Sequence, residues 1–272
     1  MTAHSNPEPW LDALAGSHDR LCDIVGGLGV DGLRRRSYCD DWTIAQVLSH
    51  LGSGAEIFQA TLDAALAGDE PPGSDTFPAI WDRWNAMTPE QQAEEFVSTD
   101  GALVESLERL GDRLEDLEVV VFGSMHVDAV GFLGLRLSEH ALHAWDVAVV
   151  LDRAVTVDGD AVALLVDRLP LMAQWAGRAD GAGDARPLVV TVCTTDPARR
   201  FVLRVDDAVS LTSQEESGGE LSEDPGSGAA ATLDIGAEPF LRLVYGRLDT
   251  GHSPAREPHE LLDLLRGVFQ GL

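Results

Sequence analysis

FLGLRLSEHALHAWD, the stretch from Phe132 to Asp146, has the sequence pattern of an amphipathic helix. It contains no proline, and its apolar residues recur every three or four positions. Glu139 and His143 are four residues apart, so a helix places both side chains on one face, one turn apart. A carboxylate and an imidazole in this arrangement can share one divalent metal ion. His50 is the upstream candidate for a third ligand.

Ordinary structural roles compete with this interpretation. A glutamate and a histidine at this spacing are also typical of a surface ion pair, and an isolated histidine such as His50 is typically hydrogen-bonded and half-buried. Asp146 follows His143 by three residues, so it either orients that imidazole or is a solvated charge. The two roles of each residue cannot be separated by spacing alone.

The neighbouring charged residues are expected to be structural. Arg136 precedes Glu139 by three residues and is expected to form a salt bridge with it or with Asp146. His140 is expected to be exposed, because it points about 100° away from Glu139 on a helix. His18 has no partner at ligand spacing, so we expect no special role for it.

The patterning along the chain predicts an α+β protein with two domains, residues 1–153 and 154–272. The first half reads as a helical bundle, in which Thr43 and Gln46 fit a capping box at a helix start. The second half has short β-branched runs separated by turn residues, as in a meander, together with helices. The expected helices are Trp10–Leu28, Thr43–Leu66, Ala79–Met87, Pro89–Leu117, Asp128–Leu151, Asp158–Trp175, Glu238–Tyr245 and Pro258–Phe269. The expected strands are Leu188–Cys193, Phe201–Val205, Ala208–Thr212 and Ala231–Ile235.

The excess of acidic side chains argues against some classes of binding partner. The 272 residues include 46 acidic and 19 basic side chains, and the formal net charge is -27. Such a surface repels nucleic acid and anionic lipid, so we expect neither as a partner. No apolar run is long enough to span a membrane, and the N-terminus lacks a secretory pattern, so we expect a cytoplasmic protein. The three cysteines are far apart in sequence and are each expected to be small buried apolar residues.

The three candidate ligands predict a particular chemistry. Two neutral imidazoles and one carboxylate would hold a divalent ion with a net charge of about +1 and would leave a coordination position open. An open zinc site binds water or a thiol, and it stabilises the thiolate near neutral pH. Imidazole and carboxylate ligands suit several ions, so Zn²⁺ and other divalent metals all fit.

Two motifs resemble a known family. DDWTIAQVLSHL, residues 40–51, looks like the D-W-T-v-x-x-v-x-x-H-L motif of the mycothiol-dependent maleylpyruvate isomerase family, which belongs to the DinB-like metal-dependent thiol transferases. RLSEHALHAWDVA, residues 136–148, is similar to that family's second motif, R-x-x-E-x-x-x-H-a-x-D-v-a. The Trp84-Asn85 pair with Thr88-Pro89-Glu90 fits its third helix, and LVYGR, which ends at Arg247, resembles a recurrent C-terminal segment.

This resemblance implies a fold and a site. The fold would be a DinB-like four-helix bundle followed by a smaller α/β domain that is sterol-carrier-like. The metal would be zinc, held by the residues that match His50, Glu139 and His143. The thiol cosubstrate would be mycothiol, a neutral polyol thiol. By the same resemblance, Arg247 would reach over the metal as a catalytic residue and meet an anionic group of the substrate.

We therefore predict a metal-dependent enzyme that activates a low-molecular-weight thiol, mycothiol, for transfer to a small electrophile or for its cis–trans isomerisation. A non-catalytic ligand- or partner-binding protein on the same scaffold is the alternative. A third possibility is a metal-dependent hydrolase with Asp146 or Asp41 as its general base. The electrophile's pocket is expected to be shaped by the loops Pro71–Pro78 and Val119–His126. The sequence identifies neither the electrophile nor the oligomeric state.

Overall fold

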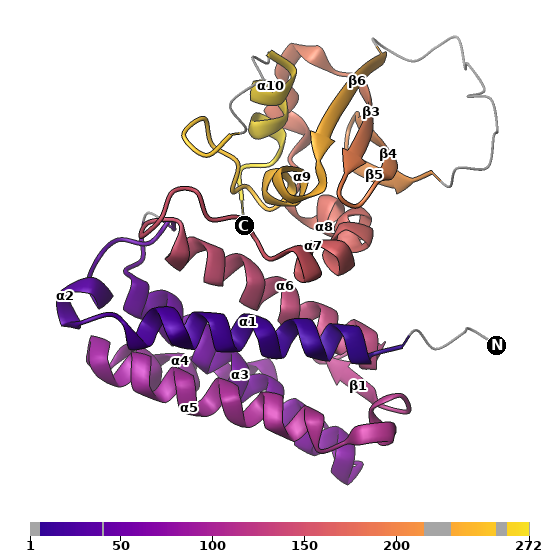
Figure 1. The fold of residues 1–272 in the computed structure, drawn as a ribbon. Helices are drawn as coiled ribbons and strands as arrows, with labels where there is room; N and C mark the ends of the chain where they lie inside the picture. The colour runs from indigo at the N-terminus through magenta and orange to yellow at the C-terminus, as the bar shows by residue number, and fades with distance from the viewer. Residues whose placement is uncertain (1–5, 40, 215–229, 254–259, 272) are drawn as a thin grey trace. The chain divides into compact units, whose positions relative to one another are not determined.

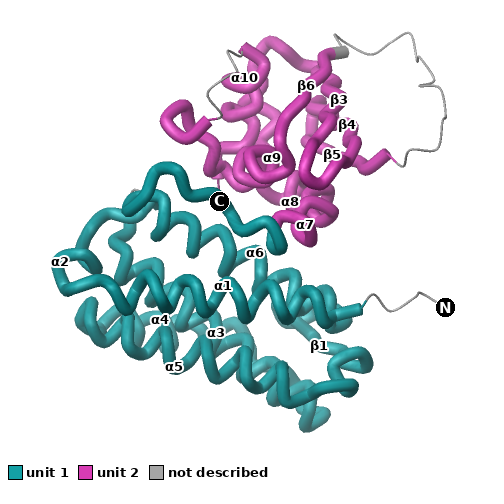
Figure 2. The backbone as a smooth tube through the Cα atoms, in the orientation of Figure 1, with its two compact units in different colours: residues 1–161 teal, residues 162–272 magenta. Residues whose placement is uncertain are grey.

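The computed structural model describes residues 6–39, 41–214, 230–253 and 260–271. The fold is α+β, as predicted, with a helical N-terminal region and a smaller sheet-containing region after it. The chain divides into two compact units, Met1–Ala161 and Val162–Leu272, which Figure 2 shows in separate colours. Each unit is described by itself. Among the described residues, no helix combines the length and the apolar character that crossing a membrane requires.

Unit 1 is a bundle of four long helices with short elements at their connections (Figure 1). The long helices are α1 (Glu8–Gly26), α3 (Ile44–Ala67), α5 (Pro89–Glu108) and α6 (Ala129–Ala148). The connections contain α2 (Val30–Leu33), η1 (Ser74–Thr76), α4 (Phe77–Asn85), η2 (Gly111–Leu114), β1 (Glu118–Val121) and β2 (Met125–Asp128). Strands β1 and β2 pair as an antiparallel hairpin.

The helix ends follow local sequence signals. Thr43 and Gln46 form the expected capping box at the start of α3, and Gly68 ends that helix with a φ of 74°. The predicted helix Pro89–Leu117 is too long, because α5 ends at Glu108. Gly111 has a φ of 51°, which lies outside the α-helical range, so α5 could not continue through this position, and the short turn η2 begins there.

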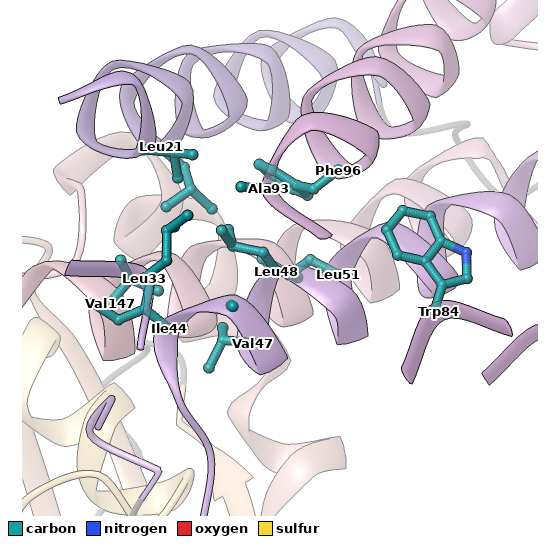
Figure 3. Close-up of a cluster of buried hydrophobic side chains, with 12 residues drawn as sticks. Leu21, Leu33, Ile44, Val47, Leu48, Leu51, Trp84, Ala93, Phe96 and Val147 are labelled. Atoms are coloured by element: carbon teal, nitrogen blue, oxygen red, sulfur yellow. The ribbon is translucent and has the colours of Figure 1, made fainter. Parts of the chain in front are cut away.

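The core of unit 1 lies where α3 packs against α5 and α4 (Figure 3). Leu48, Leu51, Phe96 and Trp84 are all fully buried there. Gly52 permits this packing, because a Cβ atom at that position would lie 2.2 Å from the Trp84 ring. The indole is also held by a hydrogen bond, since its Nε1 donates to a carboxylate oxygen of Glu56 at 2.9 Å.

We expect Gly52→Ala to lower the free energy of unfolding by about 1–3 kcal/mol, the usual cost of overpacking a core. The added methyl group can be accommodated only if the buried indole moves away from α3. Urea denaturation followed by circular dichroism measures the change. Gly26→Ala is the matched control, because a Cβ at that helical position meets nothing within 4 Å. Equal stabilities of both variants would contradict this account of the packing.

Unit 2 contains a four-stranded sheet in the order β5-β4-β3-β6. The strands are β3 (Leu188–Thr195), β4 (Arg199–Val205), β5 (Val209–Ser213) and β6 (Ala230–Gly236), and the helices that follow are α9 (Ala237–Val244) and α10 (Glu260–Val268). Strands β3, β4 and β5 form the expected antiparallel meander, whereas β6 joins the other edge and pairs with β3 in parallel.

The predicted single helix Asp158–Trp175 is wrong in detail. The structure has α7 (Gly159–Leu165), a 3-10 turn η3 (Val166–Arg168) and then α8 (Leu169–Ala176). Pro170 occupies the first turn of α8, where its missing N–H is harmless. In the middle of a longer helix, the same proline would remove a backbone hydrogen bond and clash with the preceding turn, so the chain breaks there.

Candidate functional site

The three predicted ligands meet between helices α3 and α6. His50 projects from α3, and its Nε2 lies 3.0 Å from Oε2 of Glu139 on α6. The Nε2 of His143, one turn further along α6, lies 3.8 Å from the same carboxylate oxygen. The two imidazole rings meet edge to face with centroids 4.8 Å apart. The ligand atoms of all three residues therefore lie within 4.8 Å of one another, as a shared ion requires.

Glu139 is charged in this setting. Its side chain is 47% exposed. Desolvation between the helices acts to raise its pKa, but the hydrogen bond with His50 and the electrostatic attraction of His143, His50 and Arg136 lower the pKa of Glu139 to about 2. The carboxylate is consequently ionised at neutral pH, and its charge faces two imidazole nitrogens.

Asp146 fixes the orientation of His143. Its carboxylate is fully buried, and Oδ2 accepts a hydrogen bond from His143 Nδ1 at 2.8 Å. A carboxylate can only accept, so Nδ1 carries the proton and the lone pair of the neutral ring is on Nε2, on the side of Glu139. Of the two roles considered for Asp146, the geometry favours the orienting one.

Two further residues border this group of side chains. The Cys39 Sγ donates a hydrogen bond to Oδ2 of Asp146 at 3.1 Å. The Trp42 ring stacks on that of His143 at a centroid distance of 6.0 Å and lies 5.1 Å from the His50 ring. Spacing did not indicate either residue, although both lie in or beside the first motif.

The cysteines depart from the sequence prediction. None of the three is fully buried. Two of them make polar contacts, because Cys39 donates to Asp146 and Cys22 Sγ lies 3.3 Å from Nε2 of His18. Cys22 and Cys39 therefore have polar partners, although Cys22 also packs against the hydrophobic core.

A second polar cluster links α1, α5 and α6 and corrects three predictions. Asp100 of α5 is fully buried, and its Oδ2 accepts a hydrogen bond from His18 Nδ1 at 2.6 Å. His140 is 0% exposed rather than exposed, with Nε2 3.1 Å from the same oxygen and Nδ1 2.9 Å from the hydroxyl of Ser17. Arg136 is also buried, and it pairs with the other carboxylate oxygen of Asp100 rather than with Glu139 or Asp146.

Charge explains why these groups can be buried together. Burial raises the pKa of Asp100, but Arg136, His140 and His18 together hold it well below its usual range. Burial lowers the pKa of His18, yet its hydrogen bonds to Asp100 and Cys22 raise it to about 10. Burial dominates for His140, whose pKa is lowered, so that ring is neutral. The cluster therefore contains compensating charges that join three helices.

We expect the stability of unit 1 to fall as the pH rises from about 6.5 to about 10, because the pKa of His18 is 6.5 before folding and about 10 after it. The stabilisation is fully present below pH 6.5 and is lost as the folded-state pKa is reached. Each pH unit in this window removes at most about 1.4 kcal/mol. Urea denaturation across the window measures the slope. A His18→Gln variant should lack this contribution, and an unchanged slope in it would contradict the assignment.

Arg247 lies in unit 2, three residues after the end of α9. Its Nη1 donates to the carbonyl oxygen of Tyr245 at 3.1 Å, and its backbone N–H donates to the carbonyl oxygen of Arg242 at 2.6 Å. These contacts are those of a residue that helps to close the C-terminal end of a helix. Both contacts are to residues within five positions of Arg247 in the sequence.

Comparison with known proteins identifies the family of unit 1. The family model described as "Mycothiol maleylpyruvate isomerase N-terminal domain" matches residues 14–148. No curated protein matches the chain. Among solved structures, the chain is similar to that of the mycothiol-dependent maleylpyruvate isomerase, with a TM-score of 0.63, 15% sequence identity, and coverage of 95% of this chain and 99% of that one.

A histidine-to-alanine mutant of the mycothiol-dependent maleylpyruvate isomerase is also similar, with a TM-score of 0.63 and 14% identity over 91% of this chain and 92% of the other. At these sequence identities the two solved structures support only the fold. The match to the family model supports membership of the family. The matched region, residues 14–148, includes both of the motifs found in the sequence, residues 40–51 and 136–148. Through residues 14–148, the chain belongs to the family of the mycothiol maleylpyruvate isomerase N-terminal domain, a family of enzymes.

Proposed function

We propose that this protein is a thiol-dependent enzyme in which His50, Glu139 and His143 hold a divalent metal ion such as Zn²⁺. The single observation that carries the proposal is the convergence of two imidazoles and one ionised carboxylate on a space small enough for one ion. The family relationship supports mycothiol as the thiol and a small electrophile as the substrate.

The donor set fits such an ion. The lone pair of His143 Nε2 is directed by the hydrogen bond from Nδ1 to Asp146, and the Glu139 carboxylate supplies one negative charge. Three protein ligands of this kind leave a coordination position open, as catalytic zinc sites do. A bound ion would supply the positive charge that stabilises a thiolate near neutral pH.

The reaction that follows is addition to an activated double bond. The thiolate sulfur forms a bond to one alkene carbon, and the π electrons move onto the conjugated carbonyl oxygen to give an enolate. Rotation about the former double bond and expulsion of the sulfur then yield the trans isomer and regenerate the thiolate. Protonation of the enolate carbon instead yields a stable thioether, so isomerase and transferase share the first step.

The chain's own residues have defined tasks in this proposal. Asp146 holds the His143 imidazole in one tautomer, and Trp42 packs against both imidazole rings, which limits their rotation. We assign Arg247 to an anionic group of the substrate, because a guanidinium matches a carboxylate in charge and geometry. The protein is proposed to act in the cytoplasm on small molecules rather than on nucleic acid or membranes.

The test is turnover of maleylpyruvate and of simple maleate derivatives by the purified protein, with mycothiol and zinc each supplied or withheld. We expect turnover only when both are present, and we expect a chelator to abolish it. Equal turnover without a thiol would contradict the proposal and favour a hydrolase. Metal-independent binding of mycothiol without turnover, measured by titration calorimetry, would favour a non-catalytic binding protein.

Asp146→Asn is expected to weaken zinc binding by about 10–100-fold, the usual effect of losing an outer partner of a metal-binding histidine. The amide keeps the shape of the carboxylate but no longer supplies its charge to the Nδ1 proton of His143. Competition with a zinc-sensitive dye measures the affinity. Cys39→Ser is the matched control, since its hydroxyl still donates to Asp146. Wild-type affinity in Asp146→Asn would contradict the orienting role.

A further inference from the structure

An apolar pocket lies in unit 1 outside the group of His50, Glu139 and His143. It is shallow and open to solvent, and its empty volume is about 360 Å³ when the open mouth is counted. Its walls include Ile57 and Phe58 of α3, Phe77 of α4, Phe132 of α6, and Phe122 at the turn of the β1–β2 hairpin. The segments 71–78 and 119–126, which we expect from the sequence to shape a substrate pocket, both contribute to it.

The chemistry of the pocket selects an uncharged apolar group. Its lining contains no charged side chain, and its one hydroxyl, that of Thr61, already donates to the carbonyl oxygen of Ile57 at 2.8 Å. A polyol such as mycothiol would lose hydrogen bonds to water here without replacing them. The pocket therefore does not suit the thiol, whereas an alkyl or aromatic group would bury apolar surface in it.

The pocket and the three candidate ligands share one face of the α3–α6 pair. The helices run in opposite directions, because His50 meets Glu139 whereas Phe58 meets Phe132 with ring centroids 4.9 Å apart. Ile57 is seven residues after His50, so the two lie on the same side of α3 and about 10 Å apart along its axis. The same spacing separates Phe132 from Glu139 on α6.

Between the two places, α3 carries no side chain at position 54. Position 54, which is four residues after His50 and three before Ile57, is a half-exposed glycine. The atom nearest to a Cβ built there is Nη1 of Arg136, 3.1 Å away. Because Gly54 has no side chain, the guanidinium of Arg136 from α6 lies close to the α3 backbone between the two places.

Phe122 is an unusual residue to find at the mouth of the pocket. Its φ is 50° and that of Gly123 is 78°, a pair of positive values that hairpin turns normally achieve with asparagine and glycine. A bulky aromatic residue is strained in this conformation, and this ring is also 64% exposed. Such strain at an exposed aromatic side chain indicates a role for the ring beyond the turn itself.

We propose that this pocket binds an apolar group of the electrophilic substrate, whose reactive double bond lies at His50, Glu139 and His143 about 10 Å away along α3. This inference rests on the proposed function, because it assigns the pocket to that site's electrophile. The preferred substrate is accordingly an activated cis-alkene that carries an alkyl or aromatic extension, with an enolisable carbonyl group at its reactive end.

Binding is tested first with N-phenyl-1-naphthylamine, a neutral dye whose fluorescence rises in apolar surroundings and which needs neither metal nor thiol. We expect the full-length protein to bind it, and Ile57→Trp to weaken binding at least about tenfold by filling the pocket. Val97→Trp, at an exposed apolar position on α5, is the matched control and should bind as the wild type does. Phe122→Gly should also weaken binding, and glycine accepts a positive φ, so misfolding cannot explain that result.

Turnover is tested with monomethyl and monooctyl maleate, in the presence of mycothiol and zinc. We expect a higher kcat/KM for the octyl ester, and we expect the octyl-to-methyl ratio to fall at least about tenfold in Ile57→Trp but not in Val97→Trp. An unchanged ratio, or unchanged dye affinity in both Ile57→Trp and Phe122→Gly, would overturn the inference. If neither ester reacts but the octyl ester alone displaces the dye, the proposed function fails while the preference of the pocket is supported.

Discussion

Asp100→Asn is expected to lower the free energy of unfolding by about 3–5 kcal/mol, as when one partner of a buried ion pair is removed. Asp100 is fully buried and is, among the described residues, the acid that pairs with both Arg136 and His18. The amide would keep the volume but would leave both cations without a compensating charge. Urea denaturation at pH 7, followed by circular dichroism, measures the loss.

The matched control for this variant is Asp112→Asn, which removes an exposed carboxylate. We expect its free energy of unfolding to stay within about 0.5 kcal/mol of the wild-type value. Because the cluster joins α1, α5 and α6, its loss should also reduce the protection of the α6 amides against hydrogen exchange. Wild-type stability in Asp100→Asn would show that the buried charges are compensated in some other way.

Glu139→Gln is expected to reduce both zinc affinity and thiol-dependent kcat/KM by more than about 100-fold, because a direct ligand should matter more than an outer partner. The substitution removes the one negative charge among the three candidate ligands and keeps the size of the side chain. The assay is turnover of a maleate ester with mycothiol at saturating zinc.

Stability separates this effect from misfolding. The Glu139 side chain is half-exposed and contacts His50 and His143 rather than the core, so the variant should unfold at nearly the wild-type urea concentration. Glu105→Gln is the control, since it removes an exposed carboxylate that pairs with Arg109 on the surface of α5. Full activity in Glu139→Gln would exclude the glutamate as a ligand.

The candidate site could be anticipated because its parts obey local rules. Glu139 and His143 are one helical turn apart, and a capping box at Thr43 fixes where α3 begins and hence which way His50 projects. These signals depend only on residues a few positions apart, so long-range packing does not change them. The fold class followed in the same way from the change of patterning after Arg153.

The Asp100 cluster could not be anticipated, because it depends on which helix faces which. His18 and Asp100 are 82 residues apart in sequence, and nothing in their local spacing relates them. His140 was expected to face water because Glu139 does not share its side of α6; that side instead faces Ser17 and Asp100. The parallel pairing of β6 with β3 was hidden for a similar reason, since strand order is set by long-range packing.

The number of zinc ions bound per chain is the most direct test of the account. It is measured by elemental mass spectrometry after dialysis, for the wild type and for His50→Ala, Glu139→Ala and His143→Ala. We expect close to one zinc per chain in the wild type and little or none in each variant. Zinc that is undiminished in all three variants would mean that these side chains do not form the metal site, and the thiol chemistry built on them would be wrong.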